Sequence, residues 1–275
     1  MEYVKIKVLK DTTINELLIN LNLGIHRIND LINSGNIKIG KKTLGHHDIL
    51  KKNQIITIDI TKYETIDYTP TKYKIDILYE DDYLLVVNKP YGVIIYDDNS
   101  NDTLANYIRN YYLENNINRQ IRHVHRLDKE TTGCILYAKD VITHSALSKM
   151  MEEKTIKRIY RAEVIGKTLK NGIIEKPIGK DRHINNKMII SSSGKYAKTI
   201  YKTLEYNKET NTSIVELELK TGRTHQIRVH MDSIGHPLVG DKIYNKNYNG
   251  EKLQLISYSI SFIHPITMEN VDIKV

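Results

Sequence analysis

A charged segment that runs directly into an apolar one is the feature that most constrains the fold of this chain. The segment holds Asp128 between basic side chains and reads Arg122-His123-Val124-His125-Arg126-Leu127-Asp128-Lys129-Glu130-Thr131-Thr132-Gly133. It leads into the apolar run Cys134-Ile135-Leu136-Tyr137-Ala138, which predicts a buried strand. Because the strand would fix the segment beside it, we interpret Asp128 as a candidate catalytic acid.

The spacing within this segment predicts how its side chains are directed. In an extended chain, residues two apart share a face, so Arg126 and Asp128 would point into one groove and Leu127 into the core. Gly133 would let the backbone approach closely beneath the site, because glycine has no side chain to obstruct it. For any single Asp, a surface turn with a chance salt bridge is the simpler interpretation.

The remaining pattern predicts an α+β fold, because hairpin-linked strands alternate irregularly with a few helices and no βαβ unit repeats. Helices are predicted over about 103–113, 143–153 and 225–233. Strands are predicted over about 77–79, 84–90, 134–138, 157–164, 198–205, 213–220 and 253–263.

The chain is predicted to have three parts. Residues 1–60 read as a small α/β unit, with two short helices ahead of Gly24 and Gly35 and strands after them. Residues 61–74, which include Thr69-Pro70 and show no clear period, read as a linker, and residues 75–275 as the main domain.

The composition favours a polyanionic partner. The chain carries 41 basic and 33 acidic residues, a formal net charge of +8. Cys134 is the single cysteine, so no intramolecular disulfide is possible, and its apolar surroundings predict a buried packing residue. The first residues do not resemble a signal peptide, and no run approaches the roughly 18 apolar residues of a membrane helix. We therefore expect a cytoplasmic protein without a membrane partner.

Several separated motifs resemble the RluA/RluD-type family of RNA pseudouridine synthases. Besides residues 122–133, they are Leu85-Val86-Val87-Asn88-Lys89-Pro90-Tyr91-Gly92, Lys157-Arg158-Ile159-Tyr160, Gly194-Lys195-Tyr196-Ala197-Lys198-Thr199, Thr221-Gly222-Arg223-Thr224-His225-Gln226-Ile227-Arg228-Val229-His230 and Gly235-His236-Pro237-Leu238-Val239-Gly240-Asp241. The first 60 residues resemble the αL-type RNA-binding module of a small-subunit ribosomal protein. An ordinary helix and hairpin cap is the alternative for them.

The resemblance implies a mixed, largely antiparallel central sheet with flanking helices, and an enzyme that isomerises uridine to pseudouridine in RNA. It implies that no cofactor or metal is needed. Large-subunit ribosomal RNA is the favoured partner, transfer RNA is the alternative, and a monomer is expected.

The resemblance also assigns roles to residues. Asp128 would be the catalytic carboxylate, either as a nucleophile or as the base of a glycal route. Arg223 would be the fixed cation that compensates its burial, since a guanidinium pairs bidentately with a carboxylate. Tyr160 would pack on the target uracil, and Arg126 would enter the space left by the flipped nucleotide. Apart from the resemblance, Lys89 and Lys129 could line a groove for the RNA backbone, with a solvated lysine as the simpler interpretation of each, and Arg228 is interpreted as a phosphate or packing partner.

Two other functions fit parts of the pattern. The side chains of His123, His125, Asp128, His225 and His230 could form the site of a metal-dependent RNA phosphodiesterase, although the neighbouring arginines would repel a divalent ion. We interpret His225 and His230 as structural. The second alternative is a non-catalytic RNA-binding or ribosome assembly factor, which would have no physical reason to keep a buried charge pair.

Overall fold

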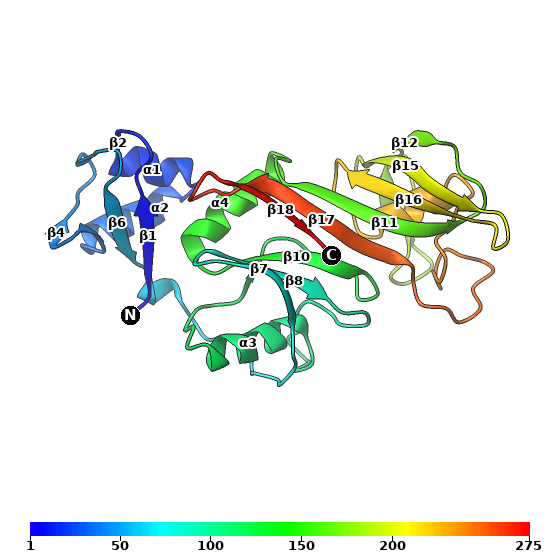
Figure 1. Cartoon of the computed structure of the whole chain (residues 1–275), viewed down its shortest axis with the longest axis horizontal. Coiled ribbons are helices and arrows are strands. Elements are labelled where there is room, and N and C mark those ends of the chain that lie inside the picture. Colours follow the sequence, from blue (N-terminus) through cyan, green and yellow to red (C-terminus); the bar gives the residue numbers. More distant parts are fainter.

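The computed structural model describes residues 1–275 and contains one large sheet, a small N-terminal unit and five α-helices. In Figure 1 the N-terminal unit lies at one end of an elongated molecule and the large sheet extends away from it. No helix is both long enough and apolar enough to cross a membrane.

The N-terminal unit is a four-stranded antiparallel sheet with two helices. Its strand order is β1-β6-β3-β4, formed by β1 (Tyr3–Lys7), β6 (Ile55–Asp59), β3 (Ile37–Ile39) and β4 (Lys42–Thr43). The helices are α1 (Ile14–Asn20) and α2 (Ile25–Asn33), and β2 (Thr12–Thr13) pairs with β5 (Ile49–Leu50). A capping box between Thr13 and Glu16 starts α1. The sequence predicted both helices but not β1.

The large sheet is mixed and largely antiparallel, as predicted. Its order is β12-β15-β16-β11-β17-β10-β8-β7, with β18 beside β17 and β9 beside β10, and only β10 and β17 run parallel. The strands are β7 (Asp76–Glu80), β8 (Leu84–Lys89), β9 (Arg122–His123), β10 (Thr132–Ala138), β11 (Lys157–Ile165), β12 (Asn171–Glu175), β15 (Lys198–Asn207), β16 (Thr212–Leu219), β17 (Leu255–Ile263) and β18 (Asn270–Lys274). A separate hairpin joins β13 (Ile178–Lys180) to β14 (Met188–Ile190), and a short 3-10 helix spans Thr61–Tyr63.

The apolar runs of β8 and β10 are continuous because both faces of these strands are buried. On one face, Val86 and Leu136 join the cluster that contains Leu147 of α4 (Val141–Glu152). On the other face, Val87 and Ile135 join the cluster beneath α3 (Leu104–Glu114). The third helix of this domain, α5 (Gln226–Asp232), packs near β14 and β15.

The N-terminal unit packs against the main domain. Its core is continuous with Val141, Ile142 and Ala146 of α4, and Figure 1 shows α4 between the unit and the large sheet. The segment that joins the N-terminal unit to the main domain is also anchored, because its Glu64 forms a buried ion pair with Arg122 at 2.7 Å. The opposite end of α4 carries Met151 and leads to the cavity described below.

Asp128 lies in a loop, which corrects the prediction of an extended segment. Residues 124–131 connect β9 to β10 outside the strands, although the N–H of Val124 still donates to the carbonyl of Leu136 on β10. The side chains of this loop nevertheless point in the predicted directions. Arg126 and Asp128 both line the same cavity, while the half-buried Leu127 packs against two core clusters. Cys134 is buried, as predicted.

Gly133 sits where the chain needs glycine. Its φ is +102°, and an added Cβ would lie 2.3 Å from the carbonyl oxygen of Ser257 on β17. The close approach predicted from the sequence is therefore confirmed, and it joins β10 to β17 directly beyond the Asp128 loop.

We expect Gly133→Ala to lower the free energy of unfolding by several kcal/mol, since it adds a backbone clash to an unfavourable φ. Gly40→Ala is the matched control: its φ is +55° but nothing lies within 4 Å, so about 1–2 kcal/mol of conformational strain is expected. Urea denaturation of both variants measures the difference. Equal losses would show that the contact with Ser257 relaxes at little cost.

Candidate active site

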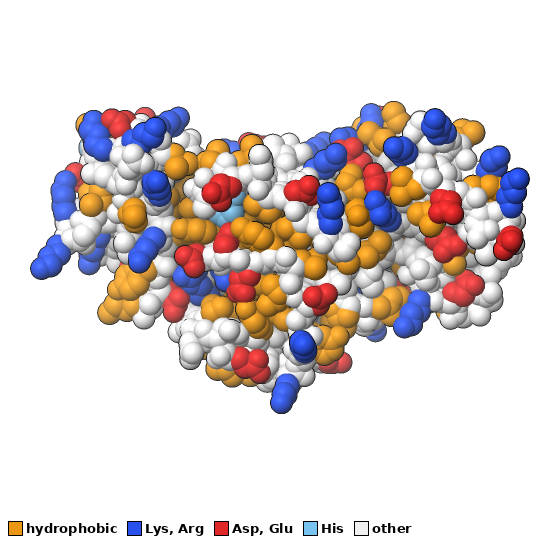
Figure 2. Space-filling view, viewed as in Figure 1, with side chains coloured by type: hydrophobic (Ala, Val, Ile, Leu, Met, Phe, Trp, Pro, Cys, Tyr) orange, Lys and Arg blue, Asp and Glu red, His pale blue; other side chains and the backbone are white.

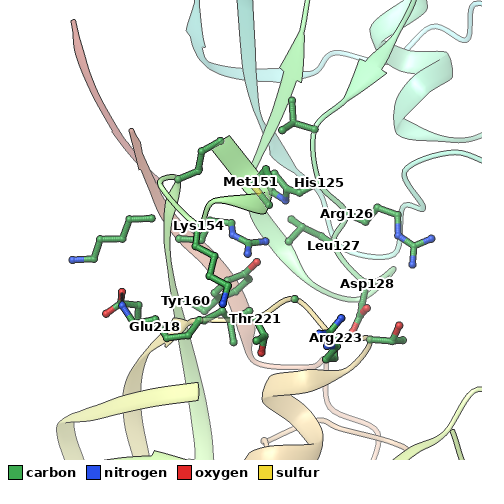
Figure 3. A pocket seen from close by; sticks show the side chains of 18 of the residues that line it. His125, Arg126, Leu127, Asp128, Met151, Lys154, Tyr160, Glu218, Thr221 and Arg223 are labelled. Carbon is green, nitrogen blue, oxygen red and sulfur yellow. Dashed lines mark hydrogen bonds and ion pairs between the residues drawn. The ribbon is translucent and has the colours of Figure 1, made fainter. Parts of the chain in front are cut away.

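A cavity of about 950 Å³ opens in front of the Asp128 loop. Its walls come from five parts of the chain: residues 94–96, the 124–128 segment, the stretch from the end of α4 into β11, Tyr196 ahead of β15, and the turn from β16 to α5. Figure 3 shows Asp128 and Arg223 on one side and Lys154, Tyr160 and Glu218 on the other. Cations dominate the lining, with Arg126, Lys154, Lys157, Arg158, Lys220 and Arg223 against Asp128 and Glu218.

Asp128 contacts two basic side chains through one of its carboxylate oxygens. Its Oδ2 lies 3.5 Å from Nη1 of Arg228 and 3.8 Å from Nε2 of His225. Arg228 lies one turn along α5 from His225, the residue that precedes the helix, which places both on the same side. The side chain of Asp128 remains 29% exposed, and its Oδ1 has no hydrogen-bond or ion-pair partner. A reacting group in the cavity can therefore reach Oδ1.

Arg228 is held in place by a second, fully buried carboxylate. Its Nε and Nη2 donate to Asp241 at 2.7 and 2.8 Å, a bidentate arrangement that leaves Nη1 for Asp128. Asp241 also accepts the backbone N–H groups of Ile243 and Tyr244. Although burial opposes the charge, the hydrogen bond with Asp241 raises the pKa of Arg228. The two carboxylates thus share a permanently charged guanidinium.

His225 is a neutral neighbour of Asp128 at pH 7. Burial lowers its pKa more than the charge of Asp128 raises it. Its backbone is left-handed, with φ at 54°, and its Nδ1 lies 3.0 Å from the hydroxyl of Tyr244. Sequence reasoning set His225 aside as structural, but the structure places it against Asp128.

Tyr160 lies at the inner end of the cavity. It is only 4% exposed, belongs to β11 and packs in the core beside β16 and β17, yet its ring lines the cavity with Asp128. Burial raises the pKa of its phenol, which therefore stays protonated at neutral pH. The structure thus brings Asp128 and Tyr160 together, as the sequence predicted.

The predicted pairing of Arg223 with Asp128 is wrong. Arg223 does line the cavity, but its Nε donates to the carbonyl oxygen of Tyr196 at 2.9 Å, and no ion pair joins it to Asp128. The backbone N–H of Arg223 donates to the side-chain oxygen of Gln226, the first residue of α5, so Arg223 lies in the turn before the helix that carries Arg228. Sequence reasoning overlooked Asp241. This acid is fully buried and therefore calls for a buried cation as its partner, which would have indicated Arg228 in place of Arg223.

Two residues expected on the RNA backbone are buried instead. Lys89 is fully buried, and its ammonium donates to the carbonyl oxygens of Pro90, Val93 and Lys129, which ties the Asp128 loop to the end of β8. Burial lowers its pKa to about 8. Arg228 is only 3% exposed and engages two carboxylates, so neither side chain can reach a phosphate.

Arg126 and Lys129 are both exposed, so each can reach RNA. Arg126 lines the cavity itself. Lys129 lies outside its lining, and its backbone carbonyl accepts the Lys89 hydrogen bond.

The histidines of the phosphodiesterase alternative do not come together. The Nε2 of His125 accepts the backbone N–H of Leu136, and both ring nitrogens of His230 bind Thr199 and the carbonyl of Lys176. No three His, Cys, Asp or Glu side chains are arranged to hold a metal ion. The structural role predicted for His230 is confirmed by these hydrogen bonds.

Comparison with known proteins identifies the class to which this fold and cavity belong. Residues 83–233 match the family model described as RNA pseudouridylate synthase. The chain belongs to this family, and it is an RNA pseudouridine synthase, an isomerase that acts on RNA.

Individual relatives span most of the chain. An uncharacterized RNA pseudouridine synthase of Bacillus subtilis (strain 168), YhcT, is 40% identical over 249 residues, which cover 88% of this chain and 82% of that protein. The ribosomal large subunit pseudouridine synthase D of Neisseria meningitidis serogroup B (strain MC58) is 34% identical, covering 90% of this chain and 70% of that protein. Among solved structures, human RNA Pseudouridylate Synthase Domain Containing 1 superposes with a TM-score of 0.63 at 26% identity, covering 74% of this chain and 83% of that chain.

Asp241→Asn is expected to lower the free energy of unfolding by about 3–5 kcal/mol, because it leaves the buried Arg228 charge without its main partner. Asp128→Asn should cost far less, since Asp128 is partly exposed and Arg228 keeps Asp241. Asp272→Asn, in an exposed ion pair with Lys274, is the control and should be close to neutral. Chemical denaturation at pH 7.5 ranks the three. A small loss for Asp241→Asn would contradict a dependence of Arg228 on Asp241.

A buried histidine beside the cavity should make stability fall with acidification. Burial lowers the pKa of His125 from 6.5 to about 3, so below pH 6.5 the unfolded chain takes up a proton that the folded chain refuses. The contribution of the neutral His125 to the free energy of unfolding is therefore complete above pH 6.5, and it is lost progressively as the pH falls from 6.5 toward 3. Between pH 7.5 and 5.0 this one group should account for about 2 kcal/mol.

Denaturant unfolding at the two pH values tests this contribution. The drop in unfolding free energy should be about 2 kcal/mol smaller in His125→Asn than in the wild type. His183→Asn replaces an exposed histidine and should keep the wild-type drop. An unchanged drop in His125→Asn would show that His125 is not the group responsible.

Proposed function

We propose that this enzyme converts specific uridines of structured RNA, in the first place large-subunit ribosomal RNA, to pseudouridine after extruding the base into the Asp128 cavity. The observation that carries the proposal is the placement of a partly exposed carboxylate with one free oxygen beside a buried tyrosine in a cavity lined by cations. Relatives named ribosomal large subunit pseudouridine synthase D support the choice of RNA.

The isomerisation breaks one glycosidic bond and forms another. The bond from ribose C1′ to N1 of uracil is broken, the base turns, and C1′ bonds to C5, which then loses its proton while N1 gains one. Oδ1 of Asp128 is the atom available either to attack the substrate or to remove a sugar proton. Arg228 and Asp241 keep Oδ2 fixed, so that the carboxylate presents the same atom in every turnover.

The cavity walls suit an extruded base. Tyr160 offers a buried ring on which uracil can stack, and base–aromatic stacking is worth roughly 1–3 kcal/mol per base. The cations of the lining can hold the phosphates on either side of the target. Arg126 is exposed at the cavity and close in sequence to Asp128, which suits the proposed insertion into the space that the base leaves.

The N-terminal unit, residues 1–60, is proposed as an RNA-binding module joined through residues 61–74 to a catalytic domain of residues 75–275. Figure 2 shows Lys and Arg side chains over the end of the molecule that this unit forms in Figure 1. Because its core continues into α4, whose other end reaches the cavity, RNA bound by the unit would be held at a fixed distance from Asp128.

Tritium release from RNA labelled at C5 of uracil tests the reaction, because C5 loses its hydrogen only when it becomes the glycosidic carbon. In the presence of chelator, the wild type should release tritium from ribosomal RNA more than from transfer RNA. Asp128→Asn and Asp128→Ala should lower the rate by more than about 10³-fold, because Glu218, the other acid of the lining, is paired with Lys220 and lies on the opposite side of the cavity in Figure 3. Asp272→Asn is the control.

Three results would contradict parts of the proposal. Full release by Asp128→Asn would remove the catalytic role of Asp128. A response of transfer RNA alone would correct the substrate. RNA binding without release from any pool would instead favour an assembly factor that does not act on these RNAs.

A further inference from the structure

The cavity has a second aromatic feature at a distance in sequence from Tyr160. Tyr96 lines the cavity and is 40% exposed, and its ring stacks on that of His123, with centroids 4.9 Å apart and an interplanar angle of 21°. His123 does not line the cavity. The stack covers one face of the Tyr96 ring, while the residue as a whole remains exposed.

His123 is a firm and uncharged support for this ring. It belongs to β9, where it pairs with Tyr137 of the doubly buried strand β10, so its position is fixed by the sheet. Burial, with further contributions from His144 and Arg126, lowers its pKa, and the imidazole is neutral at pH 7. The stack needs no charge on either ring.

Tyr96 also lacks the local partner that other tyrosines of the domain have. The phenols of Tyr107 and Tyr111 donate to Asp102 and Glu80, whereas the Tyr96 hydroxyl makes no hydrogen bond. A large side chain that is exposed, backed on one side and unbonded at its tip contributes little to the core. Its ring is available to a ligand.

We propose that Tyr96, supported by His123, is a stacking platform for the base of a nucleotide adjacent to the target uridine. This inference rests on the proposed function, in which Tyr160 receives the extruded uracil. Exposed cations other than Arg126 line the same cavity as Tyr96, among them Lys154 and Arg223, and can take the phosphate between the two nucleotides. Aromatic stacking of bases combined with cationic contacts to the phosphates is how many proteins bind single-stranded RNA.

The platform makes Tyr96 a residue for substrate binding and gives it no part in the bond changes. Stacking accepts any base, so it would hold an unpaired neighbour without reading its identity. The substrate class is thereby narrowed to uridines in loops or bulges, where the flanking nucleotide is itself free to leave the helix.

Enzyme-excess tritium release separates binding from chemistry. With a C5-tritiated transcript of large-subunit ribosomal RNA, Tyr96→Ala should raise the enzyme concentration for half-maximal rate by about tenfold and leave the maximal rate within about twofold of wild type. Tyr96→Phe keeps the ring and should behave like the wild type. Tyr73→Ala is the matched control, because Tyr73 is 42% exposed and stacks on Tyr107 at 4.3 Å but lies outside the cavity lining.

A direct readout of stacking is the fluorescence of 2-aminopurine placed beside the one uridine of a seven-nucleotide single-stranded RNA. The full-length Asp128→Asn protein should quench this fluorescence. The double variant Asp128→Asn/Tyr96→Ala should no longer quench it. The double variants that combine Asp128→Asn with Tyr96→Phe or with Tyr73→Ala should quench it as Asp128→Asn does.

The outcomes separate this inference from the proposed function. If the wild type releases tritium, three results would overturn the platform and leave the isomerase in place. Tyr96→Ala could keep the wild-type half-maximal enzyme concentration, it could lose only maximal rate, or Tyr73→Ala could raise the half-maximal concentration as much as Tyr96→Ala does. Absence of release by the wild type would count against the proposed substrate alone. In that case, quenching that depends on Tyr96 still supports the platform, and quenching that is independent of Tyr96 overturns it.

Discussion

The buried ion pair between Arg228 and Asp241 is the interaction on which the site depends. Both side chains are almost completely removed from solvent, so neither could be charged there without the other. The pair brings a permanent cation to Asp128 while leaving the group of three with one net negative charge. A carboxylate that met Arg228 alone would be neutralised by it, whereas here Asp128 is oriented and keeps an oxygen free.

The loop that carries Asp128 is fixed at two points that both follow Asp128 in the chain. The Lys89 ammonium binds three backbone carbonyls, including that of Lys129, because a buried charge must be paired. Gly133 then allows β10 to pass against β17 without a side chain between them. Both anchors are attached to β8 and β10, the strands that are buried on both faces. The cavity in front of them is correspondingly preorganised for a bulky, anionic polymer.

The fold also couples the two ends of the molecule. The N-terminal unit shares a core with the start of α4, and the end of α4 helps to line the cavity. The buried contact of Glu64 with Arg122 adds a second link, since Arg122 begins the segment that contains Asp128. The N-terminal unit and the Asp128 loop are thus joined by a shared core and by a buried ion pair.

The sequence by itself determined the α+β class, the main helices and the longer strands of the sheet, and the family resemblance that placed Asp128 and Tyr160 in one site. It missed β1 and the strands β9, β12, β13, β14 and β18. What it did determine follows from periodicity and from motifs, which are local properties of the chain. Only the tertiary structure decided which cation serves Asp128. Arg223 and Arg228 lie five residues apart and look alike in sequence, but Arg223 precedes α5 and binds the carbonyl of Tyr196, whereas Arg228 lies on α5 and binds Asp241. The same holds for Lys89, whose partners come from two loops. The identity of a charged residue is local, whereas its burial and its partner depend on which distant segments the fold packs around it.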